Sequence, residues 1–243
     1  MNNTMAHNNT MNAVISWTGG KDGCLACLKA MSEGYLITHL LHFTNVKKRG
    51  SHDMNPGIIR AQSEAMGIPL IEEDFFSYED EFKKVIRDLR ARGEKIDGAI
   101  FGHIATHRDL VERICGEMDL ELVMPLWKQD SERLLEEMIV AGLEIMVVSA
   151  KGDLMGETWL GRTIDREFIS DLGQLDALID HCGENGEYHT LVTDAPIFQK
   201  KIIITSTDRV FQDGYWFLNI HGWTLQEKSQ SGSPAHRRMP GVQ

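Results

Sequence analysis

The first half of the chain alternates between short apolar runs and segments in which apolar residues recur at helical spacing. After the first run, for example, Cys24, Cys27, Leu28 and Met31 occupy positions i, i+3, i+4 and i+7 of a helical pattern. Short runs that predict strands lie at 13–17, 35–43, 69–72, 99–101 and 121–125. Strands that alternate with helices in this way predict an α/β fold, a doubly wound (Rossmann-like) parallel sheet with right-handed crossovers.

Capping residues indicate where helices begin. Asn55 and Pro56 predict an N-cap and a first helical residue, and Ser77 and Thr106 are each followed three positions later by an aspartate. We also expect Asp22 to act as an N-cap. These boundaries give each predicted strand of the first half a helix that returns the chain to the sheet.

The pattern changes in the second half. A helix is predicted over Asp165–Asp180, and from Glu187 the chain predicts strands at 188–192, 198–206, 209–216 and 216–220. Asp213-Gly214 is a hairpin turn signal. We therefore expect an α/β domain over 13–125 and a smaller α+β domain over 126–226. Disordered tails are expected at 1–12 and 227–243.

The segment Thr18-Gly19-Gly20-Lys21-Asp22-Gly23 joins the first strand to the first helix. Glycines let the backbone approach a ligand, the N–H groups of a helix start point at an anion, and Lys21 adds a positive charge. The Walker loop requires Ser or Thr where this chain has Asp22, and the glycine spacing of dinucleotide-binding loops is absent. A phosphate site of another kind is predicted; an ordinary tight turn is the alternative.

Ligands of doubly wound sheets bind beyond the carboxyl ends of the strands. That location brings together the loops at 18–23, 42–53 and 102–108, which carry basic or hydrogen-bonding residues. Within the second loop, the basic run from Lys47 to Arg49 either meets phosphates or is a solvated charge run.

A second polar cluster lies at Cys182–Thr190, around the tight turn Asn185-Gly186. In a strand beginning at Glu187, that carboxylate and His189 share one face. Such a pair holds a cation, orients an amine or acts as a base, whereas the structural alternative is a polar entry to a hairpin.

Composition narrows the function further. The chain has 243 residues and a formal net charge of -11, which argues against sequence-independent nucleic-acid binding because that needs a basic surface. Met1–Asn12 is polar, without the apolar core of a signal peptide, so we expect a cytoplasmic protein with no membrane span. Cys24-x-x-Cys27 invites a redox or metal role, but both residues lie on an apolar stripe and are interpreted as buried small hydrophobes.

The glycine loop resembles the PP-loop of the ATP-pyrophosphatase families, Ser-Gly-Gly-x-Asp-Ser, which binds ATP for cleavage between the α- and β-phosphates. Thr18 keeps the first hydroxyl, whereas Gly23 lacks the last one. Further motifs resemble the diphthine–ammonia ligase family of PP-loop ATPases, in the family's order and spacing from about residue 13 to 223. They lie at 51–52, 62–70, 107–115, 125–127, 160–162 and 183–190.

This resemblance implies an enzyme that uses ATP and Mg²⁺ to adenylate a carboxylate, transfers ammonia to it, and releases AMP and pyrophosphate. In the family the carboxylate is diphthine on elongation factor 2; a homo-oligomer is left open. The implied catalytic residues are Lys21, Glu184, Glu187 and His189, with Asp22 for the metal. Those for ATP are Ser16, Thr18, Gly19, Gly20, Lys21, Asp22, Gly23, His42, Gly102 and His103. Those for the substrate are His52, Arg108, Glu184, Asn185, Glu187 and Tyr188.

Two departures from the family pattern leave alternatives open. His189 replaces the last glutamate of Glu-Gly-Gly-Glu-Tyr-Glu, which resembles a bacterial subgroup suggested to act near cobalamin metabolism, and His103 replaces an aspartate. The alternatives are the same reaction on another carboxylate, or a nucleotide sensor without turnover, which Gly23 and His103 would favour. A tRNA thiolation activity is disfavoured because a cluster-binding cysteine set and a basic face are missing.

Overall fold

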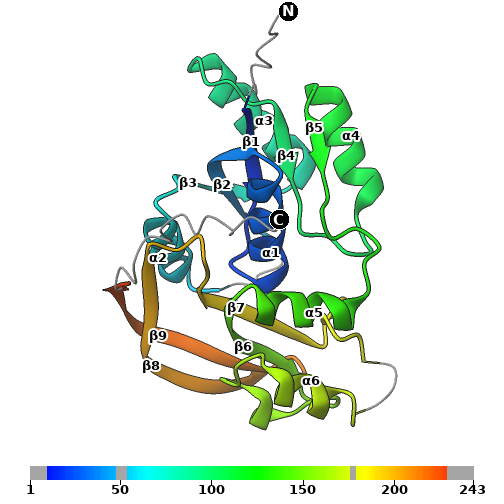
Figure 1. Cartoon of the computed structure of the whole chain (residues 1–243), viewed down its shortest axis with the longest axis vertical. Coiled ribbons are helices and arrows are strands. Elements are labelled where there is room, and N and C mark those ends of the chain that lie inside the picture. Colours follow the sequence, from blue (N-terminus) through cyan, green and yellow to red (C-terminus); the bar gives the residue numbers. More distant parts are fainter. Residues whose placement is uncertain (1–9, 48–53, 176–178, 229–243) are drawn as a thin grey trace, which may run out of the picture.

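Two sheets make up the fold of the described residues, 10–47, 54–175 and 179–228, in this computed structural model (Figure 1). The first sheet is parallel throughout, in the order β3-β2-β1-β4-β5. Its strands are β1 (Met11–Ser16), β2 (Tyr35–Asn45), β3 (Leu70–Phe75), β4 (Gly98–Ile100) and β5 (Glu121–Val123). The chain order reverses between β1 and β4, so the predicted doubly wound class is confirmed.

Helices cover both faces of this sheet. They are α1 (Lys21–Ser32), α2 (Pro56–Met66), α3 (Tyr78–Ala91) and α4 (Arg108–Met118). Successive residues of β1 point to opposite faces: Ala13 and Ile15 pack in the same core cluster as α1 and α2, and Val14 packs with Phe82 of α3. Burial on both faces explains why the strands read as continuous apolar runs.

The second sheet is antiparallel, in the order β7-β6-β9-β8. Its strands are β6 (Glu144–Lys151), β7 (Tyr188–Asp194), β8 (Lys200–Gln212) and β9 (Tyr215–Glu227), and it is accompanied by α5 (Ser131–Val140), a 3₁₀ turn (Glu157–Trp159) and α6 (Arg166–Leu172). The predicted turn at Asp213-Gly214 is confirmed, with φ of 50° and 83° as a two-residue hairpin requires. Strand β8 continues to Gln212 and β9 begins at Tyr215, on either side of this turn, so the separate strands predicted at 209–216 and 216–220 are wrong.

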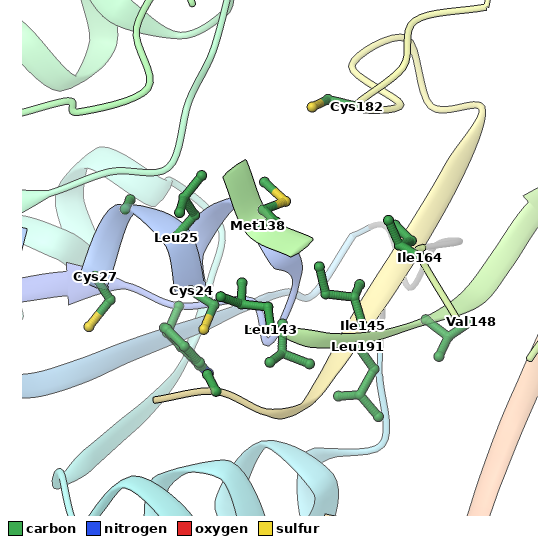
Figure 2. Close-up of a cluster of buried hydrophobic side chains, with 14 of the residues drawn as sticks. Cys24, Leu25, Cys27, Met138, Leu143, Ile145, Val148, Ile164, Cys182 and Leu191 are labelled. Atoms are coloured by element: carbon green, nitrogen blue, oxygen red, sulfur yellow. The ribbon is translucent and has the colours of Figure 1, made fainter. Parts of the chain in front are cut away.

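One apolar core joins the two sheets. Figure 2 shows Cys24 and Leu25 of α1 beside Met138 of α5, Ile145 of β6 and Leu191 of β7. The apolar stripe of α1 therefore packs against the second sheet and fixes the start of α1 relative to it.

The cysteine interpretation is confirmed as regards burial. Cys24 and Cys27 are both fully buried, and burial raises the pKa of the Cys27 thiol to about 12. A thiol with so high a pKa is a poor nucleophile at neutral pH.

Several predicted boundaries are corrected. β1 begins at Met11, so residues 11–12 belong to the sheet and not to a tail. Gly20, not Asp22, is the N-cap of α1, because the helix already begins at Lys21. Thr106 does not cap α4, since the chain turns at His107 with φ of 66°.

Of the other boundaries, some agree, one helix ends earlier than predicted and some lie outside the described part. Asn55 and Ser77 cap their helices as predicted, whereas α6 ends at Leu172 and not at Asp180. Most of both predicted tails, residues 1–9 and 229–243, lies outside the described residues, and the domain boundary near residue 126 stays a prediction. No helix in the described ranges is long and apolar enough to cross a membrane.

Candidate functional site

A cavity of about 850 Å³ is lined both by the loop after β1 and by the second sheet. Eight of the predicted site residues line it: Thr18, Gly20, Lys21, Asp22, Glu184, Asn185, Tyr188 and His189. Its volume lies within the range of about 300–1,000 Å³ that is typical of small-molecule sites. The cavity therefore unites the two polar segments that the sequence singled out.

Two glycines let the loop after β1 pass close to its neighbours. Gly19 has φ of +82°, and a Cβ atom there would lie 2.7 Å from Oε1 of Gln62. A Cβ atom on Gly20 would lie 3.3 Å from the carbonyl oxygen of Thr190 on β7. The backbone thus carries no side chain where it meets the start of α1, as an anion-binding loop requires.

Gln62 of α2 holds this loop in place. The side chain is fully buried: Oε1 accepts from Nε1 of Trp17 at 2.9 Å, and Nε2 donates to the carbonyl oxygens of Gly19 at 2.9 Å and Val192 at 2.8 Å. Sequence reasoning placed Gln62 in a family motif without giving it a role. A glutamine on an apolar helix face was the available signal.

Strand β7 completes the support of the loop. The N–H of Val192 donates to the carbonyl oxygen of Gly19 at 3.0 Å, and the N–H of Lys21 donates to Oγ1 of Thr190 at 3.1 Å. The loop conformation consequently depends on residues about 170 positions away as well as on its own glycines.

Lys21 is buried at the junction of the two sheets, with 3% of its surface exposed. Its Nζ donates to Oδ2 of Asp22 at 2.8 Å and to the carbonyl oxygen of Cys182 at 2.5 Å. Burial is the largest single effect and works against the charged ammonium, but interactions with Asp22, Tyr188 and Cys182 together outweigh it and raise the pKa of Lys21 above its usual range. Lys21 therefore stays positively charged beside the cavity.

The second oxygen of Asp22, Oδ1, is buried without a hydrogen-bond partner among the described residues. Mg²⁺ is usually held by one or two carboxylates together with substrate phosphates, so Asp22 fits that role. Among the described residues, His, Cys, Asp and Glu side chains form no cluster of three that would bind a metal by themselves.

Glu187 organises the turn that precedes β7. It is 3% exposed, and its carboxylate accepts from the backbone N–H groups of Asp180 at 2.9 Å and Asn185 at 3.0 Å. Since β7 begins at Tyr188, Glu187 does not share a strand face with His189, contrary to the prediction. His189 lines the cavity, whereas Glu187 does not.

Asp180 is a second residue that holds this turn, and it was not among the predicted site residues. Its Oδ1 accepts from the N–H groups of Cys182 at 2.9 Å and Glu184 at 3.2 Å, and its Oδ2 pairs with the Ser131 hydroxyl at 2.8 Å. Two carboxylates thus fix the turn that carries Glu184 and Asn185.

Glu184 brings a carboxylate to the cavity. Its Oε2 accepts from the N–H of Ala105, in the loop after β4, at 3.3 Å. Burial first, and then the charge of Asp22, raise the pKa of Glu184. The neighbouring Tyr188 is buried, and its hydroxyl donates to the carbonyl oxygen of His181.

The loop after β4 packs against the start of α1. A Cβ atom on Gly102 would lie 2.8 Å from the backbone nitrogen of Gly23. The ring of His103 stacks on that of His107 with centroids 5.1 Å apart, and burial followed by the charge of His107 lowers the pKa of His103 to about 4. His107 lines the cavity, whereas Gly102 and His103 do not.

The other predicted residues lie beside the cavity or apart from it. The Ser16 hydroxyl pairs with that of Tyr78, and Nδ1 of His42 pairs with the carbonyl oxygen of Trp17, each at 2.9 Å. Arg108 pairs with Glu112 at 2.5 Å. The cavity lining excludes Ser16, Gly19, Gly23, His42 and Arg108, and His52 and the basic residues Lys48 and Arg49 lie outside the described residues.

A third wall of the cavity was missed by sequence reasoning. Strand β9 contributes Tyr215, Phe217, Asn219 and His221, and Ser149 of β6 lies opposite Phe217 in the sheet. The pattern of this region predicted strands, but their register toward the cavity depends on the fold.

Fold and site together define the class of protein: an α/β nucleotide-binding protein whose phosphate loop, at the switch point of a parallel sheet, is closed over by a second sheet. The chain matches the diphthamide synthase N-terminal domain over residues 11–122 and the diphthamide synthase C-terminal domain over 130–225. It belongs to the diphthine–ammonia ligase family, and the predicted enzyme class, an ATP-dependent amide ligase in diphthamide biosynthesis, is confirmed.

Similar proteins include proteins named diphthine–ammonia ligase. The one from Danio rerio is 29% identical over 230 residues, which covers 84% of this chain and 90% of that protein. The one from Homo sapiens is 27% identical over 236 residues, covering 86% and 87%. A solved structure titled as a predicted subunit of tRNA methyltransferase from Methanocaldococcus jannaschii is 14% identical, with a TM-score of 0.41 over 76% of this chain and 98% of that one. A likeness that weak supports no conclusion about this chain.

Proposed function

We propose that the chain adenylates the carboxylate of diphthine on elongation factor 2 and transfers ammonia to it, with Mg²⁺ beside ATP. The observation that carries the proposal is the shared cavity: the phosphate loop and the 180–187 turn line it together and are joined through Lys21. An acyl transfer through an adenylate needs the nucleotide and the carboxylate in one site.

The loop supplies the positive end of the site. The N–H groups at the start of α1 and the charge of Lys21 favour phosphate binding. Both would stabilise the negative charge that the departing pyrophosphate gains. Mg²⁺, when bound at Asp22, neutralises part of the phosphate charge. Lys21 acts at short range because it is buried and cannot be screened by water.

The turn supplies the negative end. A carboxylate is a poor electrophile until adenylation gives it a good leaving group, after which ammonia attacks the acyl carbon. Glu184 of the turn lines the cavity together with Asp22 of the loop, and their carboxylates attract ammonium. Asn185 lines the same wall and offers an amide for the acyl substrate.

His189 favours a second candidate, the same reaction on a different carboxylate. This residue lines the cavity where the family pattern has a glutamate. An imidazole there removes a negative charge that would attract the cationic group of diphthine, so a substrate without that group, such as a cobalamin-related acid, is the competing possibility.

The experiment uses the whole chain with ATP, Mg²⁺, ammonium and elongation factor 2 that carries diphthine, and measures both AMP and the amide. Formation of both products supports the proposal. ATP binding without AMP would support a sensor, and AMP only with another acid would support the second candidate. Asp22→Asn should lower the Mg²⁺-dependent rate about 10-fold or more, whereas the control Asp88→Asn, on the exposed face of α3, should not change it. The cytoplasmic location and a homo-oligomeric state stay predictions, open to cell fractionation and light scattering.

A further inference from the structure

A carboxylate–imidazole pair stands at the β9 wall of the cavity, apart from the motifs already described. His221 of β9 lines the cavity, and its Nε2 pairs with Oδ1 of Asp208 on β8. Asp208 lies opposite Asn219 in the hairpin register, and Nδ2 of Asn219 donates to Oδ2 of Asp208 at 3.3 Å. Both oxygens of the Asp208 carboxylate are therefore engaged on the cavity side of the hairpin.

The hairpin is anchored beside this pair to the start of α2, a helix that packs on the first sheet. Nδ2 of Asn55, the N-cap of α2, donates to the carbonyl oxygen of Ile220 at 3.1 Å. The ring of Trp223 packs so closely on Gly57 that a Cβ atom there would lie 2.7 Å from it. These contacts hold His221 in a fixed position relative to the loop after β1, as a residue that acts on a bound reactant must be held.

The pairing also sets the chemistry of the ring. A carboxylate at Nε2 keeps the proton on that nitrogen and leaves the lone pair on Nδ1, so the ring is oriented as a base. The His221 side chain is 56% exposed, so a proton accepted from the cavity side can leave to water. A fully buried ring would have no such exit.

We propose that His221 is the proton acceptor of the ammonia step, held in the basic tautomer by Asp208. The inference rests on the proposed function, because it presumes an acyl-adenylate in the cavity. Ammonium cannot attack until it loses a proton, and Nδ1 of His221 takes that proton. The nitrogen of ammonia then bonds to the acyl carbon, the carbon–oxygen bond to AMP breaks, and a second proton passes from nitrogen to the departing phosphate oxygen.

Other titratable groups bear on this base. Asp208 faces it from β8, whereas the cavity residues at the start of α2 (Met54, Asn55 and Ile58) are not titratable. Across the cavity stand Asp22, Glu184, His107 and His189. Because several of these groups titrate, a pH profile alone would not isolate His221, and the nucleophile has to be varied as well.

The test compares His221→Gln with the unchanged protein in two half-reactions, using diphthine-bearing elongation factor 2. Adenylation is followed by exchange of labelled pyrophosphate into ATP, which needs no ammonia. Amide formation is followed with ammonium and with hydroxylamine, which is largely unprotonated at neutral pH and needs no base to become a nucleophile. We expect exchange to persist and the ammonium reaction at pH 7 to fall about 100-fold. The hydroxylamine reaction should stay within about threefold, and raising the pH should restore the ammonium rate.

Asp208→Asn should also slow the ammonium reaction more than the hydroxylamine reaction, by a smaller factor than His221→Gln, since it removes the charge that fixes the tautomer of His221. The matched control is His39→Gln, because His39 also pairs with a carboxylate, that of Glu94 at 3.5 Å, and does not line the cavity. An unchanged ammonium rate in His221→Gln would overturn the proposal, and so would equal losses with both nucleophiles and in exchange, which would indicate a structural role. If the unchanged protein forms no amide, the proposed function itself has failed.

Discussion

Replacing Gln62 by leucine removes the side chain that fastens the phosphate loop while keeping a similar volume. The amide makes all of its bonds inside the protein, to Trp17, Gly19 and Val192, and water does not reach it. In Gln62→Leu the carbonyl oxygen of Gly19 keeps the N–H of Val192 as a donor, at 3.0 Å. The indole N–H of Trp17 and the carbonyl oxygen of Val192 lose the partner they have in Gln62.

The cost follows from those two groups. A buried polar group left without a partner costs about 1–3 kcal/mol, so the two together destabilise the fold by about 2–6 kcal/mol, less the small gain from burying a leucine. The loop also loses its tether at Gly19. We therefore expect ATP affinity to fall about 10-fold or more in protein that is still folded.

Urea denaturation measures the first effect, and calorimetric titration with ATP measures the second. Gln199→Leu is the control, because the exposed Gln199 donates a single side-chain bond, to the carbonyl oxygen of Met66 at 3.3 Å, outside the cavity. Its cost should stay near 1 kcal/mol, with ATP affinity unchanged. If Gln62→Leu lowered the free energy of unfolding by less than about 1 kcal/mol and left ATP binding unchanged, the conclusion that Gln62 holds the phosphate loop in place would be refuted.

Three further predictions follow from the same geometry. Gly23→Ser should fit, since a Cβ atom there would lie 3.8 Å from its nearest neighbour. The added hydroxyl should tighten ATP binding about fivefold in a titration. As a control, Gly102→Ser should weaken ATP binding, because its Cβ atom would lie 2.8 Å from a backbone nitrogen. Glu187→Ala should cost about 3 kcal/mol in urea denaturation and abolish amide formation while sparing ATP binding, and a parallel loss of ATP affinity would place Glu187 in the nucleotide pocket. The pKa of His103 is lowered from 6.5 to about 4, so between these values the unfolded chain binds more protons and stability should fall as the pH drops. His103→Gln should reduce this loss of stability, which amounts to up to about 3 kcal/mol between pH 7 and 4. Melting curves taken over that pH range measure it.

The fold was predictable because its signals are local and repeated. Strands buried on both faces give apolar runs, helices give a 3.6-residue period, and caps such as Asn55 and Ser77 bond groups only two or three residues away. A predicted helix boundary was wrong where a contact from a distant part of the chain determines the backbone. Asp22 has the residue type of an N-cap, yet the N-cap is Gly20, two residues earlier, and the N–H of Lys21 is satisfied by Thr190 of β7.

The candidate site was predictable only in part, for a related reason. Its glycine loop and its second turn each carry a local motif, so the sequence found both. Whether a side chain in them faces a ligand or supports the backbone depends on contacts that the sequence does not display. Glu187 illustrates this: its type and spacing predicted a strand-face acid, and the structure places its carboxylate on the N–H groups of its own turn.

The junction at Lys21 shows why the two sheets form one site and not two adjacent ones. The backbone of Lys21 depends on Thr190, its ammonium on the carbonyl oxygen of Cys182, and its charge on Asp22. A buried lysine that lost one of these partners would be strongly destabilising, because its charge would be uncompensated. Any ligand that draws Asp22 away from Lys21, as a metal ion bound to phosphate would, must therefore return negative charge to the ammonium. In the proposed function the phosphates of ATP would supply that charge, which would couple nucleotide binding to the placement of the 180–187 turn through a single side chain.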